Sequence, residues 1–189
     1  LAPEVALPAT LTFSIPAKYG PPMAVAYSDV QGRLLNLEFT TAASGELMTI
    51  SFNAPTANFQ FEYYDTGLDV SASTRRYNFA GAAAYPIQTL VLQVQQPVGA
   101  SGLTAAPALG QATVGTDRLT YLSAVRADVP AGDAITLDLT YTKNDSSLTI
   151  SSQPPAVSTT VSPSTASAVQ PASPALVASV IVGLVGIAL

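Results

Sequence analysis

The densest group of polar and aromatic side chains lies in FEYYDTGLDVSASTRRYNF, residues 61–79. Glu62, Asp65 and Asp69 place three carboxylates close together there, and the segment DTGLD could supply oxygen ligands to Ca²⁺. The spacing does not match an EF-hand, however. A β-turn that starts at Asp65, with Gly67 in the left-handed conformation, accounts for the same residues. We therefore favour a turn and predict no metal site.

The same segment contains two adjacent tyrosines. Tyr63 and Tyr64 fall on a predicted strand, so their rings should point to opposite faces of a sheet, one into the core and one outward. An exposed tyrosine beside Asp65 offers an apolar ring face with a polar rim, which suits sugar stacking. Ordinary packing within a sheet is the alternative, because the sequence has no Trp to build a stacking platform. Tyr63, Tyr64 and Asp65 are the candidate ligand-binding residues.

Arg75 and Arg76 form a basic pair further along the segment. Alternation on a strand predicts that the two side chains lie on opposite faces. We expect a salt bridge to Glu62 or Asp69 across neighbouring strands, and the alternative is a docking site for an acidic partner.

The composition excludes several classes of protein. Cys and His are both absent, so a thiol nucleophile, a Ser-His-Asp triad, an imidazole base and ordinary zinc or haem sites are excluded. Twelve acidic residues make some close carboxylate pair inevitable, so proximity alone would not identify a glycosidase. A net charge of −5 without clustered Lys and Arg excludes nucleic-acid binding. We predict a non-enzymatic protein with no catalytic residues and no cofactor.

The residues that carry these side chains belong to a predicted all-β domain over residues 11–152, after a lead-in at 1–10. LTFSI, LLNLEFT, LMTISFN, FQFEY, IQTLVLQVQ, LTYLSAV and AITLDLTYT alternate apolar and polar residues. Turn residues separate them, and no segment before Pro174 has a helical period. About ten strands at this spacing predict an antiparallel β-sandwich of immunoglobulin-like or jelly-roll topology. The Gly- and Ala-rich stretch Pro97 to Gly115 is either a subdomain boundary or, as we favour, a long crossover loop.

The composition changes after Ser152. Residues 153–174 are rich in Pro, Ser and Thr and predict an extended stalk. Residues 175–189 are uncharged and apolar, which predicts a transmembrane helix that continues beyond Leu189, since this length spans only part of a bilayer. LAPEVALPA favours the start of a mature exported chain. The chain is therefore expected to be membrane-anchored, with its bulk extracytoplasmic.

Two further features of this predicted membrane protein concern contacts and modification. Small residues recur along one face of the predicted helix, where another helix could approach closely; they are Ala175, Ser179, Gly183 and Gly186. Asn144 begins the sequon NDS in a predicted turn and is a glycosylation candidate, as is the stalk.

Several stretches also carry a family resemblance. LEFTTAASGELMTISFNAPTANFQFEYYD, RRYNF, LQVQQPVGAS and LTYTKND, followed by the stalk and the apolar run, resemble a family of uncharacterised bacterial single-pass envelope proteins. The resemblance covers about Leu11 to Leu189. It implies an extracytoplasmic β-rich domain and a membrane helix, often followed by a cytosolic zinc ribbon whose paired Cys residues this sequence lacks. It implies no activity.

These observations lead to two hypotheses of function. The first is an accessory or structural subunit of a larger membrane or envelope assembly, with other membrane or envelope subunits and the lipid bilayer as partners. The second is a tethered module that binds carbohydrate or another surface ligand.

Overall fold

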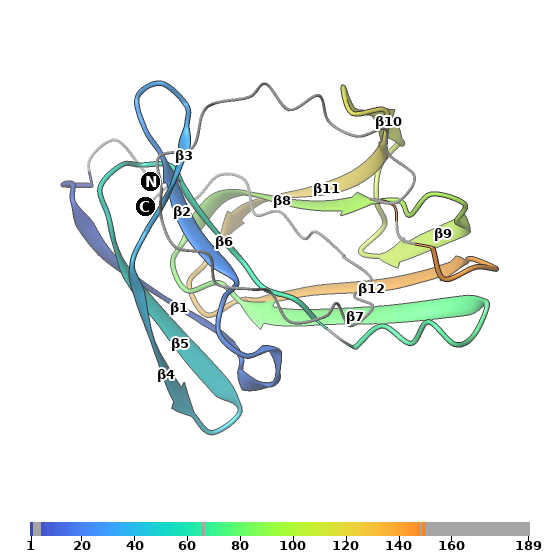
Figure 1. The fold of residues 1–189 in the computed structure, drawn as a ribbon, viewed down its shortest axis with the longest axis horizontal. Helices are drawn as coiled ribbons and strands as arrows, with labels where there is room; N and C mark the ends of the chain where they lie inside the picture. The colour runs from blue at the N-terminus through green and yellow to red at the C-terminus, as the bar shows by residue number, and fades with distance from the viewer. Residues whose placement is uncertain (2–4, 66, 148, 150–189) are drawn as a thin grey trace, which may run out of the picture.

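The computed structural model describes residues 1, 5–65, 67–147 and 149, which fold into antiparallel β-sheets with one short 3-10 helix (Figure 1). The elements are β1 (Ala9–Pro16), η1 (Ala17–Tyr19), β2 (Ala24–Ser28), β3 (Leu34–Asn36), β4 (Phe39–Ser44), β5 (Leu47–Ala54), β6 (Phe59–Glu62), β7 (Thr74–Ala82), β8 (Ile87–Gln95), β9 (Ser101–Ala106), β10 (Thr113–Val114), β11 (Thr120–Val129) and β12 (Ala134–Thr142).

Strands β1 to β6 form two three-stranded sheets, β1-β5-β4 and β3-β2-β6. Alternation along β1 and β5 places apolar side chains on one face, where they join residues of β2. The buried members of this first core are Leu11, Phe13, Ile15, Val25, Ile50, Phe52 and Ala54. Residues of β6 pack against the same core, among them Phe59 and Phe61.

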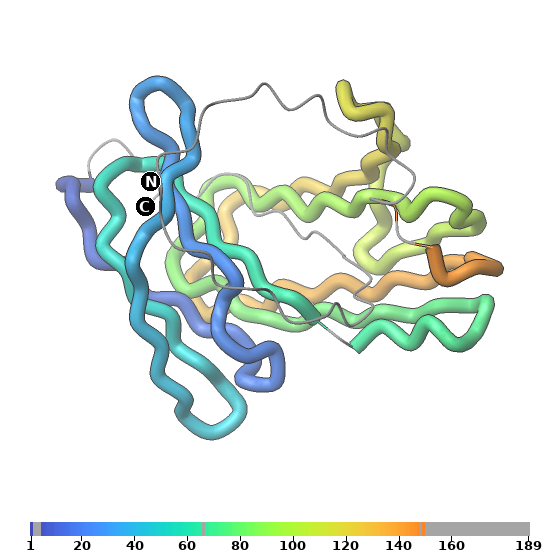
Figure 2. Tube along the Cα trace, viewed as in Figure 1, coloured from blue at the N-terminus to red at the C-terminus, as the bar shows by residue number. Residues whose placement is uncertain are grey.

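Strands β7 to β12 form two further sheets, β7-β12-β9 and β10-β11-β8, around a second core. The long strands β7, β8 and β12 supply most of its members, which include Tyr77, Phe79, Leu90, Leu92, Val94, Ile135, Leu137, Leu139 and Tyr141. Figure 2 shows the chain path, with the first group of strands on the left and the second on the right.

Tyr85, in the β7–β8 connection, joins the two groups of strands. Its hydroxyl accepts a hydrogen bond of 2.9 Å from the backbone N–H of Thr12 in β1. Its ring lies edge-on to Phe13, with the ring centroids 5.5 Å apart. Tyr63 packs against both cores. Two aromatic side chains therefore connect the first core to the second.

The structure confirms the predicted all-β, antiparallel fold class, and it differs from the sequence expectations at two places. The stretch Pro97 to Gly115 is not a featureless loop, since it contains β9 and β10. The boundary between the two cores falls instead between β6 and β7, because strands up to β6 supply the first core and strands from β7 onward supply the second. LLNLEFT forms β3 and β4 rather than one strand, because the chain crosses at Leu37 and Glu38 from one sheet to the other.

The predicted stalk and the predicted C-terminal helix lie outside the described residues. Among the residues that are described, no helix is long and apolar enough to cross a membrane.

Candidate functional site

The predicted ligand-binding residues lie just after β6, in the connection that leads to β7, so Tyr63 and Tyr64 are not on a strand, contrary to the sequence prediction. Tyr63 is half-buried and packed, whereas Tyr64 is 47% exposed, so one ring faces the core and the other faces solvent, as alternation predicts. The two rings therefore do not share a face.

Asp65 begins a tight turn through its own side chain. The Oδ1 atom of Asp65 accepts a hydrogen bond of 2.7 Å from the backbone N–H of Gly67. A Cβ atom at position 67 would lie 2.9 Å from that oxygen. Glycine suits this position because the carboxylate approaches the backbone closely.

Three tyrosines, Tyr19, Tyr63 and Tyr77, lie near this carboxylate. The rings of Tyr19 and Tyr63 stack at a centroid distance of 5.0 Å and an interplanar angle of 17°. Tyr77 comes from β7 and is buried. The Tyr19 and Tyr77 hydroxyls lie close enough to Asp65 for its charge to raise their pKa. Oδ2 is nevertheless buried without a hydrogen bond of good geometry among the described residues, so this carboxylate is only partly satisfied.

Burial and the Asp65 carboxylate act together on these tyrosines. Burial is the larger cause and raises the pKa of Tyr19 and Tyr77 well above the usual range, and their interaction with Asp65 adds to the effect. Burial, with the Asp65 charge, also raises the pKa of Tyr63 to about 12. All three hydroxyls therefore stay protonated at neutral pH.

This cluster predicts a loss of stability at high pH. The folded-state pKa values of the tyrosines exceed the ordinary value of 10.0, so their contribution is complete below about pH 10 and is lost as the pH rises above it. We expect Asp65→Asn to make the decline in unfolding free energy above pH 10 shallower, since the charge that opposes ionisation is gone. Urea unfolding at a series of pH values measures this.

Asp69→Asn is the matched control for this experiment. Asp69 makes the same kind of turn in the same connection, where its Oδ1 atom accepts a hydrogen bond from the backbone N–H of Ser71. Its replacement should leave the slope above pH 10 unchanged. An unchanged slope in Asp65→Asn would contradict the conclusion that the Asp65 carboxylate raises the pKa of the neighbouring tyrosines.

A second polar cluster lies where β12 ends. Lys143 is 3% exposed, and its Nζ donates to the Val98 carbonyl at 2.6 Å and lies 2.8 Å from the Asp145 carboxylate. The hydrogen bond from Lys143, reinforced by Ser147, holds the pKa of Asp145 well below its usual range. These contacts fasten the residues after β12 to the β8–β9 connection.

Arg75 belongs to this second cluster rather than to an ion pair with Glu62 or Asp69. It is buried, whereas Arg76 is exposed, as alternation predicts. Its Nη2 donates to the Asp145 carbonyl, and its Nε is buried without a partner among the described residues. Hydrogen bonds from Ser71 lower the pKa of Asp69, and the charge of Arg75 adds a smaller effect, although no salt bridge joins Arg75 to Asp69 among the residues described.

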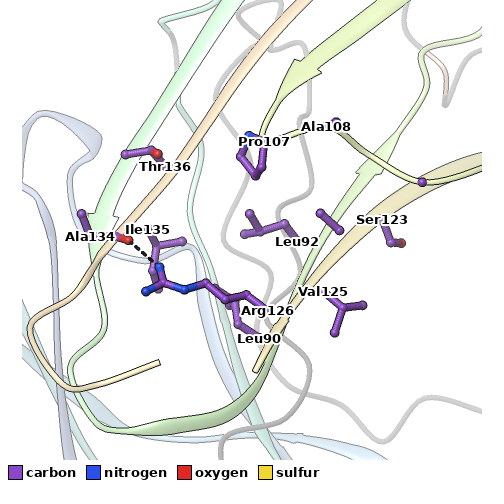
Figure 3. A pocket seen from close by; sticks show the side chains of 12 residues that line it. Leu90, Leu92, Pro107, Ala108, Ser123, Val125, Arg126, Ala134, Ile135 and Thr136 are labelled. Atoms are coloured by element: carbon purple, nitrogen blue, oxygen red, sulfur yellow. Dashed lines mark hydrogen bonds between the residues drawn. The ribbon is translucent and has the colours of Figure 1, made fainter. Parts of the chain in front are cut away.

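An open pocket of about 580 Å³ lies between β8, β11 and β12 (Figure 3). Leu90 and Leu92 form its apolar wall, and the segment from Pro107 to Gly110 borders it. Arg126 crosses one side, where its Nη1 donates to the Ala134 carbonyl at 3.3 Å and its Nη2 lies 2.5 Å from the Asp133 carboxylate. The guanidinium is already paired, so the pocket offers an apolar lining without a free charge.

Sequence reasoning did not find Tyr19, Tyr77 or the pocket. Tyr19 lies 44 positions before Tyr63, and no local pattern reports their stacking. The described residues include no group of three or more acidic side chains placed to hold a metal ion. Asn144 is exposed in a bend. Ala175, Ser179, Gly183 and Gly186 lie outside the described residues.

No protein-family model matches the sequence, and neither a curated protein nor a solved structure was found to be similar to it.

Proposed function

We propose that this protein is a non-enzymatic, membrane-anchored extracytoplasmic protein that serves as an accessory or structural subunit of a larger membrane or envelope assembly. We further propose that the strands of residues 11–152 form a β-sandwich of immunoglobulin-like or jelly-roll topology. The apolar, uncharged run at 175–189 and the Pro/Ser/Thr-rich segment before it support the anchored arrangement.

The observation that carries the subunit role is the outer face of sheet β1-β5-β4. Register places small, uncharged side chains side by side on this face: Thr10, Thr12 and Ser14 of β1, Thr49, Ser51 and Asn53 of β5, and Thr40, Ala42 and Ser44 of β4. All are at least partly exposed. The exposed Leu47 of β5 shares this face. A face whose strand residues carry no charge has few desolvation costs, and an exposed apolar side chain on it suits contact with another flat surface.

Two of the hydroxyl groups on this face bond to each other. Thr12 Oγ1 and Ser51 Oγ lie 3.0 Å apart across the two strands. Because local partners satisfy such groups, they can be covered by a partner at little cost. A tethered module that binds a surface ligand is the second candidate, and the pocket lined by Leu90 and Leu92 supports it.

The test of the subunit role uses the small residues at the C-terminal end. Gly183→Leu should release the protein from its complex on native gels of detergent-solubilised membranes, because the added side chain blocks close helix approach. Val185→Leu, expected on the opposite face, is the matched control and should leave the complex intact. Equal migration of both variants with the unaltered protein would argue against a helix-mediated assembly.

A further inference from the structure

The free edges of the sheets differ in how they are protected. The β1 edge is blocked, because Tyr85 accepts the Thr12 N–H that points away from β5. Strands β3 and β10 are short, β6 ends in Glu62, and β7 carries the exposed Arg76. Strand β9 is irregular, with Gly102 at φ 63° and a register shift against β12, whereas β8, which also lacks a charge and a proline, buries its apolar face in the second core. Strand β4 has neither a charged residue nor a proline, and its side chains from Thr40 to Ser44 are exposed on both faces. Such an edge is open to pairing with another strand.

The hydrogen-bond pattern identifies which groups of β4 are free. The Thr12 N–H points away from β5, so the opposed pair Thr12 and Ser51 is not hydrogen-bonded. Ser51 must then direct its backbone groups to the other side, toward Thr40 of β4. Backbone direction alternates along a strand, so the N–H and C=O groups of Thr41 point to the open edge. Figure 1 shows β4 at the margin of the molecule.

We propose that β4 pairs antiparallel with β4 of a second copy of this chain, with Thr41 opposite Thr41 on a twofold axis. This register uses the free backbone groups of Thr41 in both copies. It would join two three-stranded sheets into one sheet of six strands. A twofold arrangement is the commonest symmetry of protein dimers, and it buries the same patch on both copies.

Side-chain size fits this register. Phe39 of one copy lies opposite the small Ala43 of the other on the core-facing side, where Phe39 is now only partly buried. Thr40 lies opposite Ala42 on the outer side. Large side chains thus meet small ones, as close strand pairing requires.

Charge also fits this register. The acidic residues that flank the strand are Glu38 and Glu46. Pairing about Thr41 places Glu38 opposite Ser44 of the second copy and Glu46 opposite Asn36. No two carboxylates are directly opposed, so the pairing avoids the like-charge repulsion that would disfavour it.

The β4–β5 turn fixes the position of β4 relative to β5 within one copy. The β4–β5 turn consists of Gly45 and Glu46, and Gly45 has φ 60°, which a two-residue hairpin of this kind requires at its first position. Strand β4 is therefore presented in a fixed conformation. The interface involves one strand from each copy and belongs to the small, weak class, so the association should depend on concentration.

Single cysteines test the register, because the chain has no Cys of its own. In a hydrogen-bonded antiparallel pair the two Cα atoms at position 41 lie about 5.5 Å apart, within disulfide range. The two Cα atoms at position 43 would lie about 14 Å apart along the strands. Under mild oxidation of the full chain at high micromolar concentration, Thr41→Cys should therefore form a covalent dimer about tenfold faster than Ala43→Cys.

Equal crosslinking of Thr41→Cys and Ala43→Cys, or no crosslinking of either variant, would contradict the proposed register. Sedimentation velocity over a concentration series gives an independent readout: Thr41→Lys should abolish association, because it opposes two like charges on the axis. Thr74→Lys, on the exposed start of β7 in the second group of strands, should associate like the unaltered protein. Association that survives Thr41→Lys would place the interface elsewhere.

Discussion

A chain that ends at Ser152 is expected to remain in aqueous solution, whereas the chain that continues to Leu189 is expected to require detergent. The described strands carry alternating polar residues on their outer faces, among them Thr12 and Ser51. Residues 175–189 carry no charged side chain and no polar one except Ser179. Transfer of such a run into a bilayer is favourable, while its exposure to water is not. Partition between membrane pellet and supernatant measures the difference.

A charged variant of the full chain is the matched control. Val182→Asp together with Val185→Asp keeps the length and places two carboxylates inside the apolar run. Each costs about 2.5–3.5 kcal/mol at the centre of a membrane helix, so this chain should move to the supernatant. A full-length chain that stays monodisperse in plain buffer would be incompatible with a membrane anchor.

The strands that the sequence predicts best are those with one face in a core and the other in water. In β1, β5 and β12 the apolar residues recur at every second position, and each of these runs faces a core. The physical cause is the two-residue period of a strand, which couples the sequence directly to burial. The sequence therefore predicts on which face of the sheet each side chain of these strands lies.

The boundaries between sheets were not predictable in the same way. Leu35, Leu37 and Phe39 alternate with polar residues, yet the chain changes sheet between Leu35 and Phe39. Alternation indicates only that one face of a strand is buried, and it does not indicate which sheet the strand joins. The backbone hydrogen bond from Leu37 to Val25, 2.8 Å long, is a nonlocal contact that fixes this crossing.

The candidate site was predictable only in part, for the same reason. Opposite orientations of Tyr63 and Tyr64 follow from strand geometry alone. The approach of Tyr19 and Tyr77 to Asp65 depends on how separate strands pack, and no spacing within the sequence encodes it. Arg75 shows a related limit: alternation predicts an inward position, but the backbone carbonyl that receives its hydrogen bond belongs to Asp145, 70 residues away.

Phe13→Ala is expected to cost about 3–5 kcal/mol of unfolding free energy, the largest effect of a single substitution that we predict. Phe13 is 9% exposed and contacts four aromatic rings. The ring centroids of Phe52, Phe59, Phe61 and Tyr85 lie 5.8, 5.7, 5.3 and 5.5 Å from its own. Truncation removes all four contacts and leaves a cavity that surrounding β-strands cannot easily close.

The loss should extend beyond the first core, because Tyr85 belongs to the second group of strands and uses Phe13 as its packing surface. Urea unfolding followed by circular dichroism measures the change. Val125→Ala is the control: this side chain is 68% exposed, so its truncation should change stability by less than about 0.5 kcal/mol. If Phe13→Ala cost no more than Val125→Ala, the aromatic cluster around Phe13 would contribute little, and the connection between the two cores would have to depend on Tyr63 instead.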